Sequence, residues 1–267
     1  MHIRPIAALL LLASLTAAQT THMVNNGPSF AFSPSALTVQ VGDTVTWVWK
    51  GGLHTVDSGS GGLPNGIFSS GTPTGTVGFT FSVTFDHAFL ASHPVPNNVY
   101  PYMCLIHSTL GQNGTITVVQ TPTVTTYGCL NPAGSLTTVS GVPKVGTTWT
   151  VAADNPLATQ APGSLAFLVV ASAAAPGYPC GVSLPGFGMA ATGAVGELLV
   201  DLSPPNPLVN AGPVPWLGSP ASFPLAIPSL STLVGAQVFA QGLVVDLAPG
   251  AQVLFGATEG LAATIGS

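Results

Sequence analysis

The chain has 267 residues, of which 3 are basic and 8 acidic, and its formal net charge is −5. Such mild acidity offers no basic surface for nucleic acid or for an anionic membrane. Past the N-terminus, every apolar run is interrupted by Gly, Pro or polar residues well before the ~18 residues of a spanning helix, so we expect no membrane-spanning segment. The length allows two small domains or one large one.

The N-terminus has the features of a secretory signal peptide. Arg4 precedes the apolar residues 7–13, and Thr16, Ala17 and Ala18 fit a small-residue cleavage site. We therefore predict a signal peptide over residues 1–18, with a buried N-terminal helix as the alternative. Export would make the mature chain a secreted protein, in the periplasm, outside the cell or on its surface, where the environment is oxidising.

Residues 19–119 read as a series of short strands. Apolar and polar residues alternate in several segments, which is the pattern of strands with one buried face. Gly and Pro punctuate the intervals, and short strands separated in this way favour an antiparallel sandwich. The predicted strands cover residues 37–41, 44–49, 79–85, 99–103 and 115–119.

A Thr-rich, uncharged stretch over residues 120–126, which includes Pro122, is predicted to be a linker. Residues 127–267 follow, contain no histidine, and have a similar strand-like texture. We expect a second β-sandwich-like domain there, so the predicted fold class is all-β throughout. Its strand candidates are residues 149–152, 165–170, 197–202, 237–247 and 253–257.

The chain has three cysteines, Cys104, Cys129 and Cys180. An odd number in an exported protein raises the question of which one is unpaired. Cys104 lies three residues before His107, a metal-like spacing, whereas the other two both lie in the second region. The economical assignment is a Cys129–Cys180 disulfide and a free Cys104 thiolate held by a metal.

Cys104 and His107 follow a predicted strand and can both reach one metal ion from a tight loop. One loop cannot surround a metal, so a further ligand must come from elsewhere in the chain. His54, in a loop that begins with Gly51 and Gly52, is the candidate, although a lone histidine is more often a solvated surface group. Two imidazoles and a thiolate suit copper in both oxidation states.

Four segments in combination resemble plastocyanin and its cupredoxin relatives, over about residues 24–119. The resemblance implies a Greek-key β-sandwich with one copper ion that cycles between Cu(II) and Cu(I). It also implies that His54, Cys104 and His107 are the equatorial copper ligands. The matching segments are residues 32–47, 54–56, 68–71 and 102–107.

At the position of the family's axial ligand, usually Met, this chain has Gln112 with the family's spacing from His107 kept. Stellacyanin-like relatives carry Gln at this place, so the resemblance implies an axial amide oxygen; the alternative is a loop amide with ordinary hydrogen bonds. An amide oxygen is a harder donor than a thioether and is expected to favour Cu(II), which lowers the reduction potential.

The expected function is one-electron transfer by a carrier that is not an enzyme. In the family the loop histidine reaches the surface through an apolar patch, so Leu53, Ile106 and Leu110 are expected to form a docking site for a redox partner that the sequence does not identify. Copper sequestration or delivery without redox traffic, and a structural or adhesive role, are the alternatives. Residues 127–267, loosely similar to β-rich extensions of secreted bacterial proteins, are expected to bind a cell-surface or protein partner or to add stability.

Overall fold

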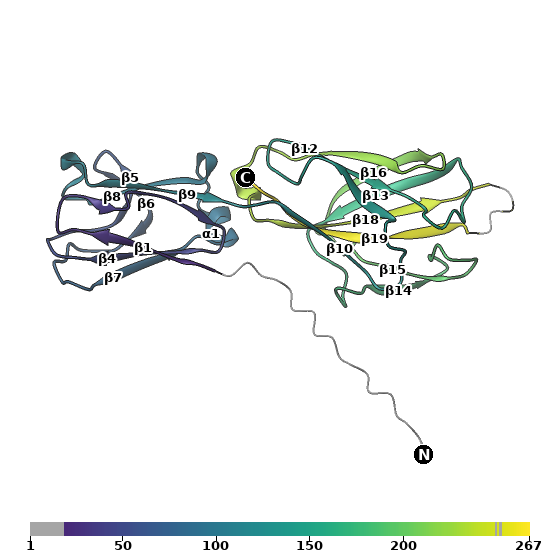
Figure 1. Cartoon of the computed structure of the whole chain (residues 1–267), viewed down its shortest axis with the longest axis horizontal. Helices are drawn as coiled ribbons and strands as arrows, with labels where there is room; N and C mark the ends of the chain where they lie inside the picture. The colour runs from purple at the N-terminus through teal and green to yellow at the C-terminus, as the bar shows by residue number, and fades with distance from the viewer. Residues whose placement is uncertain (1–18, 249, 251–252) are drawn as a thin grey trace, which may run out of the picture.

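The computed structural model describes residues 19–248, 250 and 253–267, so the predicted signal peptide lies outside the described residues. Figure 1 shows two β-rich parts along the long axis, with the N-terminal strands in one and the C-terminal strands in the other. The all-β prediction is confirmed. The helical elements of the described chain are short: α1 (His87–Ser92), η1 (Pro96–Asn98), η2 (Ser108–Leu110) and η3 (Ser231–Leu233).

The N-terminal part consists of two sheets. The first has the strand order β2-β1-β4-β7 and comprises β1 (Thr21–Asn26), β2 (Phe32–Ser33), β4 (Thr44–Trp49) and β7 (Thr80–Thr84). The second has the order β3-β9-β8-β5-β6 and comprises β3 (Ala36–Gln40), β5 (Asp57–Ser60), β6 (Leu63–Ser69), β8 (Val99–Met103) and β9 (Asn113–Val119). Strand β1 pairs with β4 and β3 pairs with β9 in parallel, and the other pairs are antiparallel.

Strand β4 shows why this sequence forms a sandwich. Val45, Trp47 and Trp49 are fully buried, whereas Thr44, Thr46 and Val48, which alternate with them, are half-buried on the opposite face. Thr46 Oγ1 lies 2.8 Å from Ser82 Oγ on the neighbouring strand, so the outer face is tied by cross-strand hydroxyl pairs. Each fully buried large apolar side chain contributes about 1.5–3 kcal/mol through the hydrophobic effect. The shared core also includes Val24, Phe32, Val39, Phe68, Phe85, Tyr100, Tyr102, Ile116 and Val118.

The C-terminal part has a five-stranded sheet, a three-stranded sheet and a hairpin. The large sheet has the order β10-β19-β18-β13-β16, with β10 (Thr123–Tyr127), β13 (Ser164–Ala171), β16 (Pro207–Trp216), β18 (Gln237–Val245) and β19 (Phe255–Thr264). The small sheet has the order β11-β12-β17, with β11 (Leu136–Ser140), β12 (Thr148–Ala153) and β17 (Ala221–Ala226). The hairpin joins β14 (Val182–Pro185) and β15 (Val195–Leu198).

Strand β10 occupies most of residues 120–126, the stretch predicted to be a linker. It pairs antiparallel with β19 along its whole length. Tyr127 is buried at its end, where the phenol donates a hydrogen bond of 2.7 Å to the Leu199 carbonyl. The physical reason is that Thr and Val are β-branched and fit a pleated, half-buried surface, which outweighs the linker-like absence of charge.

The two parts of the chain are in direct contact. Val234 belongs to the N-terminal core, and Asn98 Nδ2 donates a hydrogen bond of 3.2 Å to the Ser231 carbonyl. Nδ1 of His87 lies 3.2 Å from the Val234 carbonyl oxygen. Asn98 precedes β8 and Cys104 follows it, which separates this contact from Cys104 by ~20 Å of extended chain.

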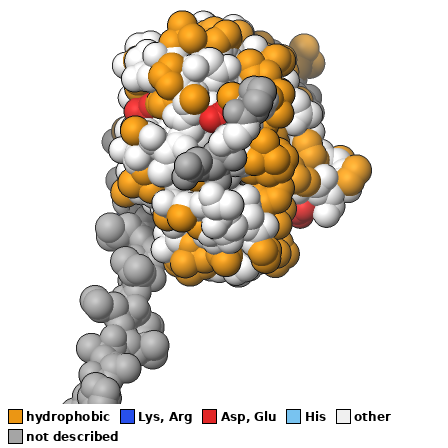
Figure 2. Space-filling model, turned by 90° about the vertical axis from the view of Figure 1, so that its right-hand side faces the viewer, with side chains coloured by type: hydrophobic (Ala, Val, Ile, Leu, Met, Phe, Trp, Pro, Cys, Tyr) orange, Lys and Arg blue, Asp and Glu red, His pale blue; other side chains and the backbone are white. Residues whose placement is uncertain are grey.

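The surface of the C-terminal part is poor in charge. Figure 2 shows hydrophobic and uncharged polar side chains over most of this end of the molecule, with isolated acidic groups. This fits a chain in which 4% of the residues are charged. Within the described residues, no helix has the length and apolar character needed to cross a membrane.

Candidate metal centre

His54 lies in the loop between β4 and β5, and its backbone is held on both sides. Its N–H donates to the Thr74 carbonyl at 3.0 Å, and its carbonyl accepts from the Thr74 N–H at 3.1 Å. The indole Nε1 of Trp49 also donates to the His54 carbonyl at 3.3 Å. This bracing fixes where the imidazole can point.

The loop between β8 and β9 carries Cys104, His107 and Gln112 and closes on itself through backbone hydrogen bonds. The Cys104 N–H donates to the Gln112 carbonyl at 3.0 Å, and the His107 N–H donates to the Cys104 carbonyl at 3.1 Å. The Gln112 N–H donates back to the His107 carbonyl at 3.3 Å. Gly111, with φ of 92°, supplies the left-handed conformation that closes the turn.

The structure brings the four predicted site residues together. Cys104 Sγ lies 3.4 Å from His107 Nδ1 and 3.9 Å from His54 Nδ1, and the two Nδ1 atoms are 3.2 Å apart. Gln112 Oε1 lies 2.9 Å from His54 Nδ1 and 3.1 Å from His107 Nδ1. His54, Cys104 and Gln112 are buried, whereas His107 is half-buried.

This spacing fits a metal ion. Ligand bonds of about 2.0–2.3 Å in a trigonal or tetrahedral arrangement place the donor atoms about 3.3–4.0 Å apart. The distances among the two imidazole nitrogens and the sulfur, from 3.2 to 3.9 Å, fall close to that range. In the described chain, the other clustered group of potential ligands is Cys129, Cys180 and Glu197, but its two sulfurs are joined in the predicted disulfide.

Thr55 connects the His54 loop to the cysteine. Its backbone N–H points at Cys104 Sγ from 3.4 Å, and its hydroxyl oxygen accepts a hydrogen bond of 2.9 Å from the Leu105 N–H. Donors of this kind stabilise a thiolate, which is the metal-binding form of cysteine. The same residue therefore orients the sulfur and holds the second loop in place.

The surroundings of His54 favour its neutral form. Burial of this imidazole lowers its pKa, and so does the charge of His107. The hydrogen bond with Gln112 and the Gly51 carbonyl raise the pKa, but burial outweighs them and the pKa of His54 is lowered overall. The neutral form is the one that coordinates metals. Nε2 is buried and makes no hydrogen bond of good geometry, although the Gly51 carbonyl is near enough to influence the pKa. A proton on Nε2 leaves the Nδ1 lone pair facing the cluster.

The predicted apolar patch residues are all exposed: Leu53 by 55%, Ile106 by 43% and Leu110 by 59%. Sequence reasoning missed Phe30, which is 52% exposed and whose ring centroid lies 4.4 Å from that of His107. Phe30 sits between β1 and β2, more than seventy residues from His107 along the chain. No local pattern links the two, so only the paired strands bring Phe30 to this surface.

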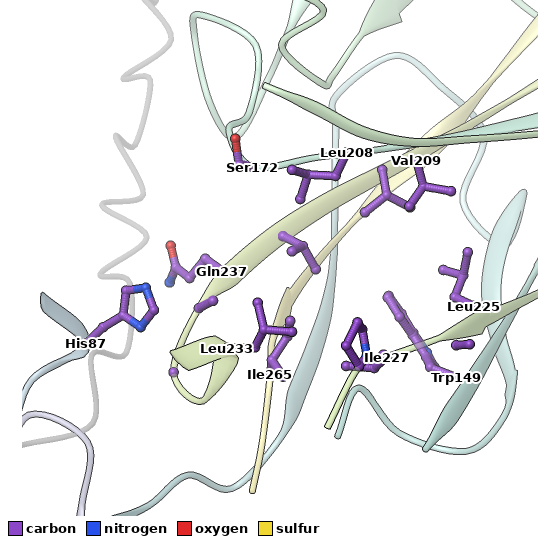
Figure 3. A pocket seen from close by; sticks show the side chains of 16 residues that line it. His87, Trp149, Ser172, Leu208, Val209, Leu225, Ile227, Leu233, Gln237 and Ile265 are labelled. Atoms are coloured by element: carbon purple, nitrogen blue, oxygen red, sulfur yellow. The ribbon is translucent and has the colours of Figure 1, made fainter. Parts of the chain in front are cut away.

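A separate cavity of about 790 Å³ lies in the C-terminal part, away from the metal cluster. Figure 3 shows Trp149, Leu225 and Ile227 on one side of it and Leu208 and Val209 on another, with His87 at its edge. His87 is the one titratable side chain among its lining residues. The cavity therefore offers no acid–base pair and no metal-ligand set.

A β-sandwich in which two histidines and a cysteine converge is the arrangement of a protein that could hold a metal ion. The family model of copper-binding proteins of the plastocyanin/azurin type matches residues 18–119. The chain is 32% identical to plastocyanin of Scenedesmus fuscus over 95 residues, which cover 34% of this chain and 88% of that protein. The chain therefore belongs to the plastocyanin/azurin family of copper-binding proteins.

Other relatives match about a third of the chain. Halocyanin of Natronomonas pharaonis is 38% identical over 97 residues, or 35% of this chain, and the match spans 50% of halocyanin's own length. A purple cupredoxin from Nitrosopumilus maritimus is 26% identical with a TM-score of 0.29, covering 36% of this chain and 97% of that structure. An amicyanin mutant in its reduced state is 25% identical with a TM-score of 0.26, covering 36% and 79%.

Proposed function

We propose that this protein is a one-electron carrier with a single type 1 copper site. The observation that carries the proposal is the convergence of His54 Nδ1, His107 Nδ1 and Cys104 Sγ at 3.2–3.9 Å from one another. Two imidazoles and a thiolate with one weaker further ligand suit electron transfer by copper, and Gln112 Oε1 would be that weaker ligand. Copper, when bound, supplies the Cu(II)/Cu(I) couple.

The role of the protein is to hold the ligands still. The hydrogen bonds within the 104–112 loop and the Leu105–Thr55 bond fix both loops without any contribution from the ion. Ligands that are already in place need not rearrange when the charge on the ion changes. Rigidity of this kind supports electron transfer over delivery, which requires the site to open.

The exposed patch around His107 is proposed to be the docking site for the redox partner. Leu53, Ile106, Leu110 and Phe30 give it an apolar character, and the half-buried imidazole of His107 lies against Phe30. The contact with the C-terminal part lies near Asn98, at the other end of β8, so this surface is free of it. An apolar partner surface of similar size is the expected complement.

We further propose that the mature protein is secreted and that residues 19–119 form the copper domain. The Cys129–Cys180 disulfide supports an oxidising compartment, because such bonds are rare in reducing ones. Residues 127–267 have their own core, which includes Trp149, Leu168 and Phe223. They are proposed to serve attachment or partner binding.

The proposal is tested by optical and EPR spectra of the purified protein after addition of Cu(II), beside a Cys104→Ser variant. An intense thiolate-to-copper absorption and a narrow hyperfine splitting are expected in the wild type and absent from the variant. The control is Cys129→Ala/Cys180→Ala, which removes the other cysteines and is expected to keep both signals. A pale spectrum that is insensitive to Cys104 would overturn the proposal in favour of a structural role.

A further inference from the structure

Behind the cluster of candidate metal ligands, two buried side-chain amides form a hydrogen-bonded pair, and metal binding alone does not require this pair. Gln112 Nε2 donates to Asn26 Oδ1 at 2.8 Å, and both residues are fully buried. Asn26 in turn donates from Nδ2 to the Thr55 carbonyl at 3.4 Å. Asn26 is the last residue of β1 and comes from a segment of the chain that supplies no ligand.

This relay of hydrogen bonds, which runs from Gln112 through Asn26 to the Thr55 carbonyl, allows only one orientation of the two amides. The Thr55 carbonyl can only accept, so Asn26 must turn its NH₂ group toward it. Asn26 Oδ1 then faces Gln112 and can only accept, which requires the NH₂ group of Gln112 on that side. The Gln112 oxygen is left facing the two Nδ1 atoms, at 2.9 and 3.1 Å.

The opposite orientation of the Gln112 amide would remove its ability to bind a cation. A rotation of the amide by half a turn keeps the shape of the side chain but presents the NH₂ group, which has no lone pair for a cation. In a buried site the two orientations differ only through their hydrogen bonds, and a buried polar group left without its partner destabilises the orientation that strands it. Asn26 supplies the contact that distinguishes them.

We propose that Asn26 is a positioning residue that fixes the Gln112 amide with its oxygen toward the copper, an inference that rests on the proposed axial role of Gln112. Asn26 acts through Gln112 and contacts no metal itself. The backbone of Asn26 is anchored independently, since its carbonyl accepts a hydrogen bond of 2.8 Å from the Lys50 N–H. A side-chain substitution therefore removes the relay while leaving this strand contact in place.

The test is a cycle of variants with Cu(II) bound: wild type, Asn26→Leu, Gln112→Leu and the double variant. The readouts are the reduction potential and the EPR hyperfine splitting. Asn26→Leu is expected to raise the potential and move the EPR signal toward those of Gln112→Leu, because the axial oxygen is no longer held. In the Gln112→Leu background, the Asn26 substitution is expected to change neither readout.

Asn155→Leu is the matched control, because Asn155 is a buried asparagine whose Nδ2 also faces a glutamine amide, Gln160 Oε1 at 3.3 Å, but far from the cluster. It is expected to lower stability while leaving the potential and EPR signal unchanged. Asn26→Ser, too short to span the relay, replaces Asn26→Leu in the cycle if the latter does not fold.

Two results would overturn the inference. In the first, the Asn26→Leu variant has the same reduction potential and EPR signal as the wild type. In the second, the Asn26 substitution changes these readouts by the same amount when residue 112 is already Leu. Failure of the proposed function looks different, because the wild type itself would then give no type 1 spectrum.

Discussion

The Nε2 atom of His54 lies 2.5 Å from the point that a Cβ atom would occupy at Gly52. A Cβ at Gly27 would lie 2.8 Å from the same nitrogen. Real side chains do not approach so closely, so the imidazole occupies space that exists only because both positions are glycine. The orientation of this candidate ligand therefore depends on residues with no side chain of their own.

Gly52→Ala is expected to displace the His54 ring and to weaken Cu(II) binding by about 10–100-fold, the usual effect of disturbing the groups that orient a metal ligand. Competition with a copper chelator measures the change. The matched control is Gly66→Ala, because Gly66 has a φ of 78°, close to the 82° of Gly52, but a Cβ there meets nothing within 4 Å. Equal losses in both variants would attribute the effect to backbone strain and contradict the contact with His54.

Gln112→Met is expected to raise the reduction potential. A thioether is a softer donor than an amide oxygen and favours Cu(I) relative to Cu(II). Spectroelectrochemical titration of the two proteins gives the difference directly. An unchanged or lower potential would remove Gln112 from the axial role.

Leu110→Glu is expected to slow electron self-exchange between two copies by about tenfold or more, because two apolar patches that meet would then carry like charges. Line broadening in NMR spectra of mixed Cu(I) and Cu(II) protein measures the rate. Leu217→Glu is the control, since Leu217 is 70% exposed in the C-terminal part. The optical spectrum is expected to stay the same in both variants; equal rates would argue against docking at this patch.

Asp43 is expected to make the stability depend on pH in the acid range. Burial alone would raise the pKa of this carboxyl, but hydrogen bonds from His22 and from the Thr20 and Gln40 N–H groups outweigh it and lower the pKa. A lowered pKa in the folded state stabilises the protein above the unfolded value of about 3.9, and this contribution is lost as the pH falls through the folded value.

Asp43→Asn is therefore expected to lower the free energy of unfolding by about 1–3 kcal/mol at pH 7 and by less at the acid end. Urea denaturation of the metal-free protein at several pH values measures both differences. A loss of the same size at every pH would mean that the charge of Asp43 contributes nothing.

Removal of the disulfide with Cys129→Ala/Cys180→Ala is expected to cost about 2–5 kcal/mol of stability, because the bond restricts the unfolded chain. The copper spectrum is expected to remain that of the wild type, since both cysteines belong to the C-terminal part. Thermal unfolding and the optical spectrum are measured on the same samples. A changed spectrum would show that the two parts of the chain are coupled at the copper site.

The sequence by itself determined the features that depend on residues close together in the chain. The alternation in residues 44–49 predicted β4, and the spacing of Cys104 and His107 predicted a shared ligand loop. The cysteine count also indicated the Cys129–Cys180 pair, which the structure confirms. Each inference depends on neighbours in the sequence or on a residue type with few possible partners.

Only the tertiary structure decided the features that join distant segments. Asn26 and Gln112 are 86 residues apart, and their hydrogen bond exists because β1 ends where the ligand loop turns. Phe30 reaches His107, and Val234 enters the N-terminal core, in the same way. The Thr-rich sequence of β10 resembles a linker, and only its pairing with β19 in the folded chain shows that it is a strand. Side-chain type limits what a residue can bind, but which group it meets is set by packing between strands far apart in the chain.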